Sequence, residues 1–132
     1  MNRPGPFTQI RTESEEQQAL FEWAAWNASK YPGLNLMFHI PNGGGRSKAE
    51  AGRFKAEGVK SGIPDICLPV ARGRWHGLYI EMKRIGGKLT AEQCTILDQL
   101  NQQGYFAVVC YGFDMARAAI EKYYIEAVRT DA

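Results

Sequence analysis

Residues 62–68 are Gly-Ile-Pro-Asp-Ile-Cys-Leu, and residues 78–83, after a polar turn, are Leu-Tyr-Ile-Glu-Met-Lys. Both stretches are typical of neighbouring β-strands. Side chains alternate between the two faces of a strand, so Glu81 and Lys83 share one face, and the apolar residues at 78, 80 and 82 share the other. A strand face that ends in an acid and a lysine is unusual as plain structure, because buried charge is costly unless it is paired or metal-bound.

Each of the two strands carries an acid that pairing would bring together. If the strands form a hairpin, Asp65 in the first lies against Glu81 in the second. Two adjacent carboxylates repel each other unless a proton or a cation lies between them. The candidate ligands are all hard oxygen atoms, so Mg²⁺ is the expected cation. Lys83 is placed beside it to hold a phosphate or to help polarise a water molecule.

The residues around these acids sharpen the pattern. They are Pro41-Asn42-Gly43-Gly44 and Arg46 upstream, Gly58 and Gly62 before Pro64-Asp65, and Gly86-Gly87-Lys88-Leu89-Thr90 with Gln93 downstream. Together with Glu81-Met82-Lys83, this arrangement resembles the VRR-NUC branch of the PD-(D/E)XK nuclease superfamily, in the short stand-alone form common in phages and prophages. The resemblance covers roughly residues 13–111.

The resemblance implies a restriction-endonuclease-like core and a Mg²⁺- or Mn²⁺-dependent endodeoxyribonuclease. In this family pattern Asp65 and Glu81 hold the metal together with the main-chain carbonyl of Met82, and Lys83 orients the attacking water. The small members are similar to Holliday-junction resolvases, so we expect a homodimer that cuts four-way DNA junctions. The same fold without activity, a nucleic-acid-binding module, is the alternative, although an intact Asp65, Glu81 and Lys83 set speaks against it.

Two further polar positions carry more than one interpretation. The superfamily usually takes another metal-site acid from its first helix, and Glu16 is our choice for that role, with Glu15 close behind. Both acids would also be favoured at the positive end of a helix dipole while facing water. Gln93 is placed to orient water or phosphate near the metal, and with Thr90 it also forms the pattern of a helix capping box.

Basic residues surround the predicted site in two groups. The first group could grip a DNA backbone, or could form an ordinary solvated helix face with i,i+4 pairs. The second lies with Trp75 at the hairpin tip, where arginine and aromatic side chains could stack on bases, or could simply be solvated. The predicted DNA-binding residues are Asn42, Arg46, Lys48, Arg53, Lys55 and Lys60, and at the tip Arg72 and Arg74.

The order of elements predicts an α/β fold with a mixed four-stranded sheet and helices on both faces. Residues 1–12 are expected to form a flexible arm, and residues 13–132 a single domain. The helix after Thr90 crosses over in the right-handed sense if the strands before and after it are parallel. We expect helices from residue 13 to before Pro32, at 47–57, from Thr90 to Gly104 and from Asp114 to about 128, and strands at 34–40, 63–70, 78–83 and 105–111.

The bulk composition is that of an ordinary globular protein of 132 residues, with 45% apolar and 23% charged residues and a formal net charge of +2. Such a small charge permits nucleic-acid binding without arguing for it, so a basic surface must be local. The three cysteines have no metal-ligand spacing, which favours reduced thiols. No apolar run has transmembrane length. We therefore expect a cytoplasmic protein, in a bacterial host cell if it is phage-encoded, with no membrane partner.

Overall fold

The computed structural model describes residues 11–41 and 47–130, with side chains described as far as Ile125. Most of the predicted N-terminal arm, residues 1–10, therefore lies outside the described residues. The mixed four-stranded sheet is confirmed. Its strands follow the order β1 (Phe38–His39), β2 (Ile66–Leu68), β3 (Leu78–Lys83) and β4 (Phe106–Tyr111). The first two pairings are antiparallel, and β3 and β4 run parallel.

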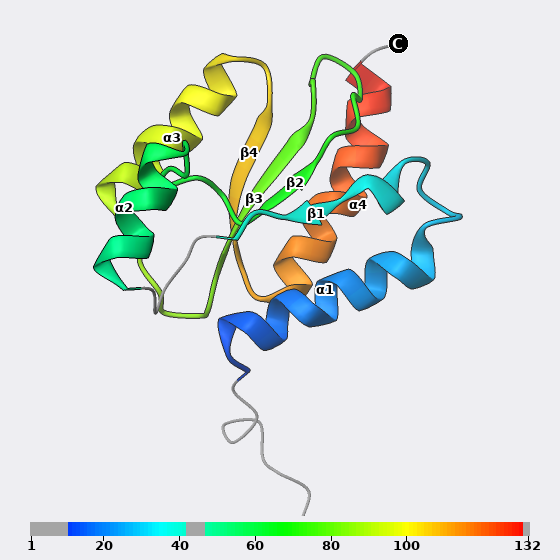
Figure 1. Cartoon of the computed structure of the whole chain (residues 1–132). Helices are drawn as coiled ribbons and strands as arrows, with labels where there is room; N and C mark the ends of the chain where they lie inside the picture. The colour runs from blue at the N-terminus through cyan, green and yellow to red at the C-terminus, as the bar shows by residue number, and fades with distance from the viewer. Residues whose placement is uncertain (1–10, 42–46, 131–132) are drawn as a thin grey trace, which may run out of the picture.

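Helices cover both sides of this sheet. Figure 1 shows α1 (Glu13–Asn27) and α4 (Phe113–Thr130) together on one side, and α3 (Ala91–Gln102) on the other. Helix α2 (Lys48–Ala56) has no buried residue. Helix α3 connects the parallel strands β3 and β4, as the sequence predicted. In the described part of the chain, no helix is both long and apolar enough to cross a membrane.

The hydrophobic core lies between the sheet and the α1–α4 layer. Its strand contribution is the apolar face of the central hairpin, which the alternation in the sequence had identified. Burying these side chains is the main favourable term in folding. The fully buried residues of this core include Leu20 from α1, Ile66 and Leu68 from β2, Leu78, Ile80 and Met82 from β3, and Ile120 and Tyr123 from α4.

The predicted strand at residues 34–40 is mostly wrong. The chain instead forms a 3-10 turn, η2 (Leu34–Leu36), and only then the two-residue strand β1. Gly33 enters the turn with a φ of 87°, and Leu34 and Met37, three residues apart, are buried. Leu36 and Phe38, which an alternating pattern would bury, are 52% and 47% exposed. A spacing of three suits the 3-10 geometry, whereas strand alternation requires a spacing of two.

Two other boundaries differ from the prediction. Strand β2 spans only Ile66–Leu68, with Pro64 before it and Pro69 after it, and a proline has no N–H to give to a sheet ladder. The last helix begins at Phe113 rather than being capped by Asp114, and its first N–H bonds to Glu16.

Of the three free cysteines, Cys67 and Cys110 are buried, and Cys94 is exposed.

Candidate active site

The β2–β3 hairpin brings the two predicted acids together at one end of the sheet. Ile66 pairs with Ile80, so Asp65, one residue earlier, is level with Glu81, one residue later. The Asp65 carboxylate accepts a hydrogen bond of 2.8 Å from the backbone N–H of Met82. Its backbone carbonyl accepts one of 2.6 Å from Ile40, and His39 Nδ1 lies 2.8 Å away. These contacts fix Asp65 from both neighbouring strands.

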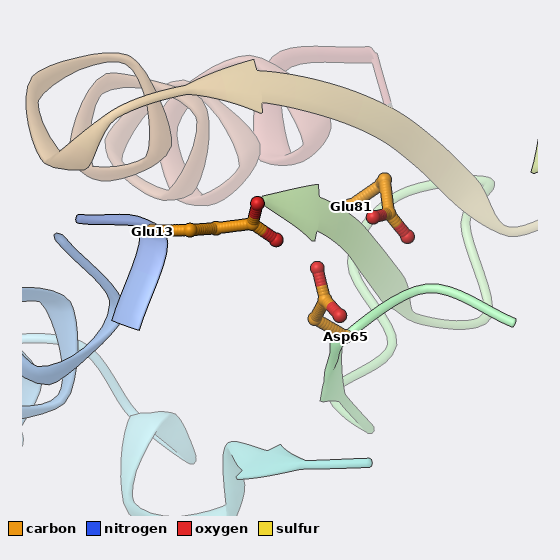
Figure 2. Close-up of side chains that lie close together, drawn as sticks. All are labelled: Glu13, Asp65 and Glu81. Atoms are coloured by element: carbon orange, nitrogen blue, oxygen red, sulfur yellow. The ribbon is translucent and has the colours of Figure 1, made fainter. Parts of the chain in front are cut away.

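A third carboxylate comes from the beginning of α1. Glu13 is the first residue of that helix, and each of Glu13, Asp65 and Glu81 has an oxygen within 4.8 Å of the others. Figure 2 shows the three side chains pointing toward one another from α1, from the segment before β2 and from β3. Glu13 is exposed, Asp65 is half-buried and Glu81 is buried. The cluster is therefore open on the side of the helix and closed on the side of the sheet.

Without a cation, this cluster is electrostatically unfavourable, because one of its carboxyl groups is buried. Glu81 is only 3% exposed. Its burial, followed by the neighbouring charge of Asp65 and a hydrogen bond with it, raises the pKa of Glu81 to about 8, although Lys83 acts in the opposite direction. The pKa of Glu13 is also raised, first by partial burial and then by Asp65. A divalent cation would relieve this repulsion, and a set of carboxylate oxygens alone suits the hard ions Mg²⁺ and Mn²⁺.

Two neutral or positive groups lie beside Glu81. The Lys83 ammonium is 4.0 Å from a Glu81 oxygen, and its side chain is only 15% exposed. Gln93 donates its side-chain amide to the same oxygen at 3.3 Å. The other end of the Gln93 amide accepts from the Thr90 N–H at 2.9 Å, completing a capping box at the start of α3. The two interpretations of Gln93 are thus compatible in the structure: one side chain caps the helix and contacts the acid.

Comparisons with known proteins identify the family and the fold. A protein-family model described as "VRR-NUC domain" matches residues 11–114. This chain belongs to the VRR-NUC family. A solved structure titled "VRR_NUC domain protein" superposes with a TM-score of 0.75 at 34% sequence identity, over 89% of this chain and 90% of that chain. No curated protein sequence gives a match. The expected restriction-endonuclease-like fold and the nuclease-type domain are therefore confirmed.

The two predicted acids of the first helix of this VRR-NUC domain, Glu16 and Glu15, have hydrogen-bond partners outside the carboxylate cluster. The Glu16 carboxylate accepts a hydrogen bond from the Phe113 N–H at 2.8 Å. The Glu15 carboxylate accepts one from the Thr12 N–H and closes a capping box at the helix start. Of the acids in the first turn of α1, it is Glu13 whose carboxylate lies with Asp65 and Glu81. The apolar stripe of the helix pointed to Glu16, whereas the site lies beyond the end of the helix, where its first residue reaches.

The predicted DNA-binding residues fall into separate places. Lys48, Arg53 and Lys55 are exposed on α2, which has no buried residue, and Lys60 is exposed in the loop that leads to Asp65. Asn42 and Arg46 lie outside the described residues.

The arginines of the hairpin tip lie at the other end of the VRR-NUC sheet from the acids. About four residues of strand, roughly 13 Å, separate Gly77 from Glu81. Arg72 is half-buried, stacks on the Tyr124 ring and donates to the Tyr124 carbonyl at 2.7 Å. Arg74 is exposed and lies over the Trp75 ring. Arg72 therefore has a structural role in the described fold, and neither arginine adjoins the carboxylate cluster.

Proposed function

We propose that this VRR-NUC protein is a Mg²⁺- or Mn²⁺-dependent endonuclease that hydrolyses DNA phosphodiester bonds. The observation that carries the proposal is the convergence of Glu13, Asp65 and Glu81 within 4.8 Å, with Lys83 next to Glu81. Three carboxyl groups at this spacing disfavour one another's ionised forms, and a structural role alone would not require them. Burial of Glu81 adds to this cost, which a bound cation would offset.

In this proposal Glu13, Asp65 and Glu81 hold the cation, joined by the main-chain carbonyl of Met82. The Met82 N–H already holds one oxygen of the Asp65 carboxylate. When bound, Mg²⁺ or Mn²⁺ would polarise the scissile phosphate and lower the pKa of a water molecule. Hard oxygen ligands distinguish this pair of ions from zinc, which favours nitrogen and sulfur.

Lys83 and Gln93 act on the substrate side of the carboxylates. The Lys83 ammonium, 4.0 Å from a Glu81 oxygen, would orient the attacking water and stabilise the extra negative charge of the transition state. Gln93 holds the Glu81 carboxylate with its amide N–H and is itself fixed by Thr90. Because α3 carries Gln93, the capping box at its start orients a group in the site.

The preferred substrate in this proposal is branched DNA, in particular the four-way junction, cut by a homodimer. Two-fold symmetry would supply two active sites for paired nicks. The exposed lysines and arginine of α2, with Lys60 in the following loop, provide a local positive surface that leads toward Asp65 along the chain. Contacts of this kind bind the phosphate backbone without reading sequence, which suits recognition of DNA shape.

Cleavage of labelled DNA tests the proposal directly. A four-way junction, a flap and a linear duplex are incubated with Mg²⁺, Mn²⁺ or EDTA, and with the wild type, Lys83→Ala and Lys30→Ala. Lys30 is a matched control, since it is exposed just beyond the far end of α1, roughly 20 Å along the helix from Glu13. We expect metal-dependent nicking of the junction by the wild type and Lys30→Ala, and none by Lys83→Ala.

Other outcomes would support a different function or contradict part of the proposal. Tight binding of the junction without cleavage in any metal would indicate an inactive DNA-binding module. Cleavage of the linear duplex at fixed sites would indicate a sequence-specific enzyme. Undiminished cleavage by Lys83→Ala would remove the assigned role of that lysine. An elution mass near the 14.8 kDa of one chain, at concentrations where the protein cuts, would contradict the homodimer.

A further inference from the structure

One side chain ties the beginning of α1 to the beginning of α4. The Glu16 carboxylate accepts a hydrogen bond of 2.8 Å from the N–H of Phe113, the first residue of α4. The first N–H groups of a helix have no partner within the helix and carry partial positive charge. A carboxylate is therefore bound there both by hydrogen bonding and by charge. Arg11, 3.8 Å from the same carboxylate, adds a second positive group.

The turn that receives Glu16 also holds the end of β3. Gly112, directly before Phe113, donates its N–H to the carbonyl of Lys83 at 3.0 Å. Gly112 has a φ of +93°, which residues with a Cβ rarely adopt, and a Cβ there would lie 3.6 Å from the Glu16 carboxylate. Residues 112–113 thus contact α1 through Glu16 and contact β3 through Lys83.

Most side chains in the first turn of α1 are exposed. The buried residues of this helix are Leu20 and Ala24, whereas Glu13, Ser14 and Glu15 are exposed. The bond from Phe113 to Glu16 joins the first two turns of α1 to another element. Helix ends without such contacts are the first segments to open.

We infer that Glu16 is a positioning residue, which holds the first turn of α1 where Glu13 can reach Asp65 and Glu81. Glu13 and Glu16 are three residues apart and therefore lie on neighbouring parts of the same helix surface. One carboxylate enters the acid cluster while the other fastens the helix to the turn that also binds Lys83. This inference rests on the proposed function, since it treats the cluster as the cation site.

The inference gives distinct expectations for two substitutions. Glu16→Ala removes the acceptor for Phe113, frees the first turn of α1 and weakens the hold of Glu13 on the cation. Replacing a group that orients a metal ligand typically lowers the affinity for the metal by about 10- to 100-fold. Glu16 acts through the helix and not through a direct contact with a ligand, so we expect about tenfold weaker Mg²⁺ binding. Glu16→Gln keeps a carbonyl oxygen for the Phe113 N–H and should retain most of the affinity.

The experiment combines calorimetric titration with Mg²⁺ and nuclear magnetic resonance of the metal-free, ¹⁵N-labelled chain. Wild type, Glu16→Ala, Glu16→Gln and Glu22→Ala are compared, the last being an exposed glutamate of the same helix. We expect the Phe113 amide to exchange faster with solvent only in Glu16→Ala. The same variant should bind Mg²⁺ about tenfold more weakly and require more Mg²⁺ for half-maximal cleavage, with a rate at saturating Mg²⁺ close to that of the wild type.

Two results would overturn the inference and leave the proposed function intact. One is wild-type Mg²⁺ affinity in Glu16→Ala despite an exposed Phe113 amide. The other is equal loss of affinity in Glu16→Gln and Glu16→Ala, which would point to Glu16 acting through its charge or as a ligand. If Glu16→Ala does not fold, the affinity of Glu16→Gln decides between these cases. A wild-type chain that binds no Mg²⁺ would overturn the proposed function, and this inference with it.

Discussion

The binding of Mg²⁺ at neutral pH should release a proton from Glu81. A carboxyl group with a pKa of about 8 is about 0.9 protonated at pH 7 and about 0.1 protonated at pH 9. Coordination requires the carboxylate, so each Mg²⁺ bound should displace about 0.9 proton from Glu81 at pH 7 and about 0.1 at pH 9. Below pH 8, the apparent affinity should therefore rise by about tenfold for each unit of pH.

The proton count is measured by titration calorimetry in buffers of equal pH and different ionisation enthalpy, because released protons are taken up by the buffer. The slope of the observed enthalpy against the ionisation enthalpy gives the number of protons. Glu22→Gln, at an exposed position of α1 outside the cluster, should give the wild-type slope, whereas Glu81→Gln should abolish binding. A slope near zero at pH 7, with Mg²⁺ still binding, would falsify the assignment of Glu81 as a buried ligand with a raised pKa.

Three further expectations concern stability. The folded-state pKa of Glu81 lies above its ordinary value of 4.5, so the folded chain binds more protons than the unfolded chain between about pH 4.5 and 8. In EDTA, the melting temperature of the wild type should fall as pH rises through this window, and Glu81→Gln should show a smaller fall; parallel curves would contradict this. Ile80→Ala, at a fully buried position, should cost about 2–5 kcal/mol in denaturant unfolding, whereas Ile85→Ala, at an 84% exposed one, should cost about 0.5 kcal/mol or less. Equal costs would refute the assigned core. Thr90→Ala removes the N-cap of α3 and should cost about 1 kcal/mol in the same measurement, and an unchanged unfolding midpoint would show that the cap contributes nothing.

The central part of this fold follows directly from residue patterns. Glu81 and Lys83 interrupt an otherwise apolar strand, and the alternation of β3 correctly separated them from the buried face of Leu78, Ile80 and Met82. The two strands are consecutive in the chain, and their pairing as a hairpin was predicted from that order. Local patterns suffice here because the two acids come from strands that are adjacent in both sequence and space.

The contribution of α1 could not be predicted in the same way. Which glutamate of the run at 13–16 reaches the acids depends on where the helix ends relative to the sheet, and this is set by packing of Leu20 and Ala24. The hydrogen bond that Glu16 accepts depends on the turn at residues 112–113, almost a hundred residues later. Likewise, the 3-10 turn at Leu34–Leu36 depends on burial of Leu34 and Met37 against other elements. Hydrophobic periodicity indicates which residues are buried, but it does not indicate which element they pack against.

The carboxylate cluster also joins distant parts of the chain. Asp65 and Glu81 come from one hairpin, but Glu13 comes from a helix that precedes it by about fifty residues. A chain in which α1 has not yet docked offers a cation only two of the three acids. Ligands that bind the native state more tightly than other states shift the folding equilibrium toward it. If the cluster binds Mg²⁺, the ion should therefore favour docking of α1 and stabilise the complete fold over partly folded forms.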